Sequence, residues 1–489
     1  MSPQHRVAIV GAGFSGLGVA IRLKAAGVDD FVILERADDV GGTWRANTYP
    51  GCQCDVPSHL YCYSFAPNPN WTRTFSRQSE IWEYLRGCVE RYGLRAHLRL
   101  GVEVHECSWQ ERDGHWLLET AAGALTARVL VGAMGALSEP SMPEIAGIER
   151  FEGPLFHSAA WRHDVELGGA RVALVGTGAS AIQIAPQIQP IAGELAVYQR
   201  TPPWILPHPD RPISERERAL YRAAPLAQKI VRGSIAWGRE ALVLGFRHPL
   251  LGGPGERLAR RHLERQVADP DLREMLRPAY RLGCKRILIS NRYYPALAQP
   301  NVTLVPHALA EIRPRSVIAA DGIERPTDVI VAATGFRVTD SPASHRIRGR
   351  DGRTLAEHWH GRPRAYKGTT IAGFPNFFML LGPHTGLGHT SVLLMIESQI
   401  DYLLGALRAM GERRIAALEP RPAAQEAFVD SVRRRARGTV WESGGCASWY
   451  LDAGGHSILW PDSARRFRRA VRRFDLESYL ARPYSFSSG

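Results

Sequence analysis

Two glycine-rich turns are the parts of this 489-residue chain with the clearest chemical potential. The first contains Gly11, Gly13 and Gly16 in a G-x-G-x-x-G pattern, directly after the apolar residues 7–10. Glycines at this spacing let a strand turn tightly into a helix, so that backbone N–H groups at the helix start can approach a pyrophosphate. Glu35, 19 residues after Gly16, ends the next apolar run, where an acid binds ribose hydroxyls. The pattern therefore predicts a dinucleotide site.

A second turn repeats this arrangement. Gly176, Gly178 and Ala181 form G-x-G-x-x-A after another apolar run, with Ser180 inside the loop. The run that follows ends in Arg200 and has no acid. A cation there suits the 2′-phosphate of NADP, and an ordinary surface arginine is the alternative. Two dinucleotide folds imply two dinucleotides, and the economical pair is a flavin with a nicotinamide that delivers hydride.

Two longer segments resemble a known family. Residues 41–55 read G-G-T-W-R-A-N-T-Y-P-G-C-Q-C-D, and residues 151–161 carry F-x-G-x-x-x-H-x-x-x-W. Both are similar to the fingerprints of class B flavoprotein monooxygenases of the type I Baeyer–Villiger kind. Trp161 favours this branch over the flavin-containing N/S-oxygenating branch, which usually has Tyr there, while Arg162 stands where the family has Pro or Asp. The resemblance covers most of the chain.

The resemblance implies FAD and NADP(H) as cofactors, and a ketone and O2 as substrates that give an ester or lactone. A heteroatom oxygenase that makes sulfoxides, N-oxides or hydroxylamines, for example from a thioether, is the nearest alternative. A flavin reductase or redox sensor without an oxygenated product is another. The implied fold is α/β, with two Rossmann-like dinucleotide-binding domains, one for FAD and one for NADP, and a helical insert in the second.

The resemblance assigns catalysis to Arg286 and Asp55. Reduced flavin and O2 give an anionic peroxide, which needs a dry site and a fixed cation, and arginine stays charged and donates from a rigid fork. Asp55 is expected to orient Arg286 at the flavin, although a solvated turn residue is the alternative for Asp55. Lys285 is expected to contact the NADP phosphate together with Arg200 and Thr201, although a surface basic pair is the alternative for the Lys-Arg step. The other expected cofactor-binding positions are Thr43, Trp44, Val104 and Trp449.

Four further sites carry weaker expectations, and no metal ligand is among them. His157 is expected to organise contacts between domains rather than to transfer protons. His384 and His389 lie in a glycine-rich late loop and face either the flavin or solvent. Residues 448–450, S-W-Y, either approach NADP and the substrate or form a core aromatic pair.

Apolar periodicity divides the chain into three parts. Strands are predicted at residues 7–10, 31–34, 116–120, 127–131, 172–175, 195–198 and 328–333, and a helical insert at about 210–282. Residues 1–145 are expected to form the first part of the FAD-binding domain and residues 146–330 the NADP-binding domain. Residues 331–489 return to the FAD-binding domain and add a C-terminal segment.

The charge and the cysteines exclude several other classes. The net charge is +13, but the arginines of residues 465–473 alternate with apolar residues at helical spacing. This spacing favours the solvated face of a helix over a nucleic-acid site. Seven cysteines, an odd and sparse set, argue against a disulfide framework and favour free thiols. No apolar run can span a bilayer and no signal peptide is visible, so we expect a cytoplasmic protein.

Overall fold

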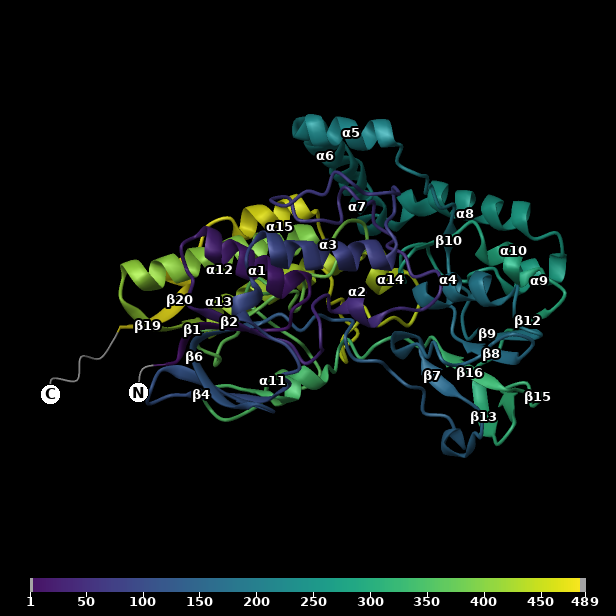
Figure 1. Ribbon diagram of the computed structural model, residues 1–489, viewed down its shortest axis with the longest axis horizontal. Helices are drawn as coiled ribbons and strands as arrows, with labels where there is room; N and C mark the ends of the chain where they lie inside the picture. The colour runs from purple at the N-terminus through teal and green to yellow at the C-terminus, as the bar shows by residue number, and fades with distance from the viewer. Residues whose placement is uncertain (1–2, 484–489) are drawn as a thin grey trace.

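The structure is a computed structural model that describes residues 3–483. Figure 1 shows two α/β halves side by side. Each half contains a sheet with parallel strands, and helices lie over the sheets. The predicted α/β fold with two dinucleotide-binding domains is confirmed.

The first sheet is built from both halves of the sequence. It has eight strands: β1 (His5–Val10), β2 (Phe31–Leu34), β3 (Leu98–Arg99), β4 (Val104–Gln110), β5 (His115–Thr120), β6 (Gly123–Gly132), β17 (Ile347–Arg348) and β18 (Phe377–Met379). They run in the order β17-β4-β5-β6-β1-β2-β3, and β18 pairs with β6. β1 pairs in parallel with β2 and β6, whereas β4, β5 and β6 are antiparallel neighbours. The chain therefore leaves this sheet and later returns to it.

Helices with apolar faces cover the first sheet. They are α1 (Phe14–Ala25), α2 (Thr43–Ala46), α3 (Gln78–Arg91) and α12 (Leu393–Glu412). α1 is buried on nearly all sides, and it contacts α12 as well as β2. Gly18 of α1 makes this contact possible, because a Cβ at Gly18 would lie 3.0 Å from Ile400 of α12. This packing fixes the glycine-rich start of α1 at the carboxyl end of β1.

The second sheet is entirely parallel. Its strands are β7 (Leu155–His157), β8 (Arg171–Val175), β9 (Glu194–Tyr198), β12 (Val302–Val305) and β16 (Val329–Ala332), and its flanking helices include α4 (Ala179–Ile188) and α10 (Tyr293–Leu297). The order is β12-β9-β8-β16-β7. β16 reads V-I-V-A and is wholly buried, as expected of a parallel strand covered on both faces.

A group of helices follows β9 and lies within the range predicted for the insert. The elements are β10 (Ile205–Leu206), α5 (Glu215–Ala223), α6 (Pro225–Ala241), α7 (Val243–Arg247), η4 (Pro249–Gly252), α8 (Gly253–Gln266), α9 (Pro270–Met275) and β11 (Leu288–Ile289). α5 begins at a capping box formed by Ser214 and Glu217, which fixes the start of the insert. β10 and β11 pair in parallel and close its base. In Figure 1, α5 and α6 project from the upper side of the molecule.

The remaining elements are short, apart from the 15-residue helix Pro422–Ala436. The strands are β13 (Leu309–Arg313), β14 (Ser316–Ala319), β15 (Glu324–Pro326), β19 (Ile415–Pro420) and β20 (Tyr479–Pro483). The helices are η1 (Arg95–His97), η2 (Ile148–Arg150), η3 (Ser158–Ala160), η5 (Pro342–His345), α11 (Leu355–Trp359), α13 (Pro422–Ala436), α14 (Val440–Ser443), α15 (Ala464–Val471) and η6 (Leu476–Ser478). Within residues 3–483, no helix combines the length and the apolar character needed to cross a bilayer.

Two linkers connect the halves and run beside each other. Residues 133–145 leave the first sheet after β6, and residues 333–341 leave the second sheet after β16. The backbone N–H of Ser141 donates to the carbonyl oxygen of Gly335 at 2.9 Å. The hydroxyl of Thr334 donates to the carbonyl oxygen of Ser141 at 2.6 Å. We call these two segments the paired linkers.

One disulfide joins distant parts of the chain and corrects the expectation of free thiols. Cys284 and Cys446 are bonded, with Cα atoms 6.2 Å apart, although they are 162 positions apart in sequence. The other five cysteines are free. The bond depends on how the insert and the C-terminal segment pack together, so it could not be predicted from the spacing of the cysteines in the sequence.

Candidate active site

The first glycine turn has no room for side chains. Gly11 has a φ of +106°, and a Cβ there would lie 2.6 Å from the carbonyl oxygen of Ala133. A Cβ on Gly16 would lie 1.9 Å from the carbonyl oxygen of Gly11. Gly13 precedes α1, so backbone N–H groups at the helix start face outward from a bare loop. This arrangement fits a pyrophosphate.

Glu35 lies beside this turn at the carboxyl end of β2. Its carboxylate accepts hydrogen bonds from the backbone N–H groups of Ala12 at 2.8 Å and Ala37 at 3.0 Å. The residue is only 9% exposed, so the acid is held at the turn. In a dinucleotide-binding fold the acid that binds the ribose lies at this position, so the fixed carboxylate of Glu35 fits that role.

The second glycine turn has the same construction. Gly176 has a φ of +112°, and a Cβ there would lie 2.5 Å from the carbonyl oxygen of Ala333. Gly178 is exposed and precedes α4, whose first turn contains Ser180. The two turns match, since Gly11 and Gly176 each touch the first residue of a paired linker. The second turn therefore fits a second dinucleotide.

Two cations lie together at the carboxyl end of β9. Burial lowers the pKa of Lys285, and the nearby charge of Arg200 lowers it further. The Lys285 ammonium also lies 5.3 Å from the ring centre of Tyr280. The carbonyl oxygen of Thr201 accepts a hydrogen bond from the Thr177 hydroxyl at 3.1 Å, which ties this end of β9 to the glycine turn. Sequence positions 200 and 285 are thus brought to one place.

Arg286 and Asp55 form a two-pronged ion pair. Nε of Arg286 donates to Oδ2 of Asp55 at 2.8 Å, and Nη2 donates to Oδ1 at 2.7 Å. The Asp55 charge raises the pKa of Arg286 above its ordinary value, so the guanidinium is a permanent cation. The side chain of Arg286 is 40% exposed, whereas that of Asp55 is 21% exposed. The pair therefore presents Arg286, and not Asp55, to the surroundings.

Tyr450 and Arg239 surround this pair; Tyr450 belongs to the segment 448–450, which was singled out from the sequence, whereas Arg239 was not predicted. Burial raises the pKa of Tyr450 to about 12, while Arg286 acts in the opposite direction. Its neighbour Trp449 is 43% exposed and packs edge-on against the Tyr450 ring at 4.4 Å. Nη2 of Arg239, on α6, lies 3.5 Å from the carbonyl oxygen of Asp55. A second guanidinium therefore reaches the site from the insert.

The remaining predicted cofactor positions lie on the first half of the molecule. The Thr43 hydroxyl is 3.5 Å from the carbonyl oxygen of Leu137, and Nε1 of the buried Trp44 donates to the Tyr61 hydroxyl at 3.1 Å. Val104 begins β4 and packs against the same core cluster as Val10, the residue before Gly11; two residues earlier, the backbone N–H of Val102 donates to the carbonyl oxygen of Glu35 at 2.9 Å. Among residues 3–483, no cluster of three His, Cys, Asp or Glu side chains has metal-binding geometry.

Comparison with known proteins decides the family. A family model described as "FMO-like: Flavin-binding monooxygenase-like" matches residues 4–211. A "Baeyer-Villiger monooxygenase" of Streptomyces coelicolor is 53% identical over 480 residues, which are 97% of this chain and 92% of that protein. One of Pseudomonas aeruginosa is 49% identical over 478 residues, 97% of this chain and 91% of that protein.

The chain belongs to the Baeyer–Villiger monooxygenase family.

Solved structures agree with this assignment. A Rhodococcus cyclohexanone monooxygenase bound to NADP+ superposes with a TM-score of 0.88 at 28% identity, covering 99% of this chain and 100% of that one. The structure titled OTEMO, in complex with FAD and NADP, superposes with a TM-score of 0.89 at 27% identity and the same coverage. The architecture of this chain therefore matches that of the solved proteins over 99% of its length.

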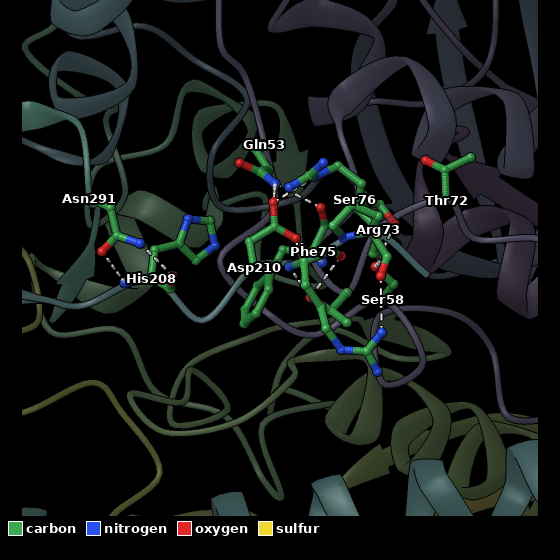
Figure 2. Close-up of polar contacts among 12 residues, drawn as sticks. Gln53, Ser58, Thr72, Arg73, Phe75, Ser76, His208, Asp210 and Asn291 are labelled. Carbon is green, nitrogen blue, oxygen red and sulfur yellow. Dashed lines mark hydrogen bonds and ion pairs between the residues drawn. The ribbon is translucent and has the colours of Figure 1, made fainter. Parts of the chain in front are cut away.

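An acid that the sequence patterns missed joins the two halves of this Baeyer–Villiger monooxygenase next to Asp55. Figure 2 shows Gln53, Arg73 and Phe75 converging on Asp210. Oδ2 of Asp210 accepts from Nε of Arg73 at 2.7 Å and from Nε2 of Gln53 at 2.9 Å, and Oδ1 accepts from the backbone N–H of Phe75 at 3.2 Å. Burial raises the pKa of Asp210, but the hydrogen bonds from Arg73 and Gln53 outweigh it and keep the pKa below its ordinary value. We call this group the Asp210 cluster.

The histidines of the monooxygenase fingerprints are all buried. His157 is 4% exposed, its Nδ1 accepts from the backbone N–H of Ala159 at 3.1 Å, and its ring lies 5.7 Å from that of Phe336 in a paired linker. This position is where a residue that organises domain contacts would lie. His384 and His389 are 3% and 2% exposed, so the solvent-facing alternative for them is wrong.

Proposed function

We propose that this chain uses NADPH and O2 to convert a ketone into an ester or lactone, with FAD as its bound flavin. The observation that carries the proposal is the Asp55–Arg286 ion pair, in which two hydrogen bonds join the two halves of the molecule and fix a permanent cation. Relatives that share about half of its residues are named Baeyer–Villiger monooxygenases, which supports the same reaction.

The residues present fit both cofactors. The first turn, with Gly11, Gly13 and Gly16, leaves no space for a Cβ at Gly11 or Gly16 and so fits the FAD pyrophosphate. Further FAD positions that we assign are Glu35, Thr43, Trp44, Asp55 and Val104. For NADP we assign Gly176, Gly178, Ser180, Arg200, Thr201, Lys285 and Trp449. A solved neighbour in complex with FAD and NADP supports the presence of both cofactors.

Arg286 and Asp55 perform the work that the protein itself must do. When bound, FAD takes hydride from NADPH and activates O2 for transfer of one oxygen atom. Arg286 offers a fixed charge to the negative oxygen that develops on the substrate carbonyl, and a preorganised cation stabilises such charge without reorganising. Asp55 occupies two of the five guanidinium N–H groups and so fixes the plane of the other three. Its second effect is to keep Arg286 protonated at every working pH.

Two cations are assigned to the nicotinamide cofactor. Arg200 and Lys285 lie close enough to influence each other, and both end at the carboxyl edge of β9. Two like charges there repel each other, and a 2′-phosphate between them would remove the repulsion. We also propose the domain boundaries 1–145, 146–330 and 331–489, and a cytoplasmic location, where NADPH is supplied.

The reaction is tested by product analysis on the FAD-loaded protein. The protein is incubated in air with NADPH and either a panel of ketones or a thioether, while NADPH consumption is followed. We expect esters or lactones in step with NADPH oxidation. Sulfoxide as the sole product would assign the protein to heteroatom oxidation. NADPH oxidation that yields only hydrogen peroxide with every substrate would indicate a flavin reductase, and either result contradicts the proposal.

A further inference from the structure

The helical insert carries most of the exposed apolar side chains in the molecule. Of the fifteen large hydrophobic residues that are exposed within residues 3–483, nine lie between positions 220 and 258. They are Leu220, Leu226, Ile230, Trp237, Leu242, Leu244, Leu250, Leu251 and Leu258. Single exposed apolar residues are ordinary on a protein surface, but a concentration of this kind indicates a binding surface.

Three of these residues form a stripe along one face of α6. Leu226, Ile230 and Trp237 are 68%, 65% and 63% exposed. With the exposed Gly233 between them, they follow one another at steps of four, three and four residues, which places them on one side of a helix. A stable water-facing helix would carry polar residues at these positions. We call this set the α6 stripe.

The opposite face of α6 is turned toward the active site. Gln228 is 3% exposed. Nη1 of Arg232 donates to the carbonyl oxygens of His59 at 2.8 Å and Cys62 at 2.9 Å, and Arg239 approaches the carbonyl oxygen of Asp55. The helix thus has a complete set of inward contacts without using the α6 stripe.

A basic helix adjoins the α6 stripe. α15 buries Phe467 and Val471, while the arginines on and after its other face are exposed: Arg465, Arg466, Arg468, Arg469, Arg472 and Arg473. The Arg465 guanidinium lies 5.9 Å from the ring centre of Trp237. Glu240, at the end of α6, accepts from the backbone N–H groups of Ala464 at 3.2 Å and Arg465 at 3.4 Å. In Figure 1 both helices lie on the upper side of the molecule. These contacts bring the end of α6 against the start of α15.

This surface is positively charged. Arg466 pairs with Asp462 at 3.0 Å. Within residues 3–483, the other five arginines have no carboxylate within ion-pairing distance, and Lys229 is exposed beside the α6 stripe. Four of the five also line a surface hollow with Ser398 and Asp401, and Asp401 is already paired with Arg22.

The positive charge of this surface limits which kind of partner can cover the α6 stripe. A second copy related by a two-fold axis would bring this surface against itself, and arginine would face arginine. An anionic membrane is complementary to both the apolar stripe and the arginines. Its acyl region accepts Leu, Ile and Trp side chains, and its headgroups attract arginine. We infer that the α6 stripe and the exposed arginines of α15 bind the surface of an anionic phospholipid membrane. The helix that covers the active site would then lie against the phase in which apolar ketones concentrate.

Vesicle co-sedimentation of the full-length, FAD-loaded protein tests this inference. The probes are phosphatidylcholine vesicles and phosphatidylcholine vesicles that contain phosphatidylglycerol. We expect sedimentation with the phosphatidylglycerol vesicles only, and loss of binding as salt is raised. Arg468→Ser with Arg469→Ser should weaken partitioning by roughly fivefold per arginine. Ile230→Ser with Trp237→Ser should abolish it.

Matched controls separate the surface from general effects. Ile191→Ser with Ile323→Ser removes two apolar side chains of similar exposure, 53% and 55%, outside the insert, and it should leave binding unchanged. The flavin spectrum and circular dichroism verify that each variant is folded. Equal binding by Arg468→Ser/Arg469→Ser and the unmodified protein would overturn the inference, as would absence of binding to both vesicles. A concentration-dependent dimer in sedimentation velocity that Ile230→Ser/Trp237→Ser abolishes, without vesicle binding, would assign the surface to a second copy instead.

Discussion

Arg286 holds the carboxylate of Asp55 through two hydrogen bonds of 2.8 and 2.7 Å, although the two residues are 231 positions apart in sequence. Asp55 comes from the first half of the molecule, and Arg286 follows the helical insert of the second. The pair that we propose as catalytic is therefore also a contact between the two halves of the molecule.

Arg286→Ala should retain FAD and still oxidise NADPH, but lose oxygenated product by roughly 100- to 1,000-fold, the usual cost of removing one preorganised donor. Arg286→Lys keeps a charge without the fork and should recover only part of the product. The measurement is product formed per NADPH consumed. Arg281→Ala, five residues earlier with a side chain 51% exposed, is the control and should behave like the unmodified protein. Full product yield from Arg286→Ala would remove this residue from the mechanism.

Arg200→Ala should raise the KM for NADPH by roughly 10- to 100-fold, because it removes a charge-assisted contact to the 2′-phosphate. NADH lacks this phosphate, so its KM should not change. Steady-state kinetics with both nucleotides measure the difference. Arg315→Ala is a suitable control, since Arg315 is 86% exposed and pairs only with Glu152 among its described neighbours. An equal rise in KM for NADH would place the phosphate elsewhere.

Asp210→Asn should destabilise the protein by roughly 1–3 kcal/mol at neutral pH, because the Asp210 cluster loses its charged acceptor. The pKa of Asp210 is lowered in the folded state, so its stabilisation is present above the ordinary value of about 4 and is lost as the pH falls below it. The difference between the two proteins in denaturant titrations should therefore shrink in acid.

The control for the Asp210 cluster is Asp321→Asn. Asp321 has an i,i+4 partner, Arg325, and makes no contact between the halves. We expect Asp210→Asn alone to lower product formed per NADPH, since Gln53 lies two residues before Asp55. Unchanged coupling in Asp210→Asn would show that the cluster contributes stability only.

Reduction of the Cys284–Cys446 bond should loosen the active site. Cys284 directly precedes Lys285 and Arg286, and Cys446 comes shortly before Trp449. Cys446→Ser should lower stability by up to about 5 kcal/mol on the chain-entropy account and should decrease coupling. Thiol titration of the denatured protein should give five groups, and seven after reductant. Seven groups without reductant would contradict the bond, and reductant should leave the stability of Cys446→Ser unchanged.

Local patterns predicted the elements that position the cofactors. β2 was placed at residues 31–34 and observed at Phe31–Leu34, because a short run of buried apolar residues between polar turns admits few other structures. β16 was predicted at 328–333 and observed at Val329–Ala332 for the same reason. The three-stranded sheet of β13–β15 was not predicted, because its strands are short and two of them, β13 and β15, are largely exposed.

The candidate site was predictable only in part. The glycine turns and Arg200 follow from spacing, whereas the roles of Asp55 and Arg286 came from the family resemblance. Asp210 and the Cys284–Cys446 bond could not be found in this way. Each depends on side chains from segments more than 100 residues apart, and the residue pattern within one segment does not predict its contacts with a distant one.

The paired linkers limit how the two halves can move. Each linker begins at an alanine that contacts a glycine turn: Ala133 lies against Gly11, and Ala333 lies against Gly176. The two linkers are then hydrogen-bonded to each other. A connection made of two tethered strands resists swinging and permits mainly torsion about its own length. The two halves, and with them the two nucleotide-binding turns, can therefore reorient mainly by twisting about the axis of the paired linkers. Cleavage of one linker alone would leave the halves joined by the other.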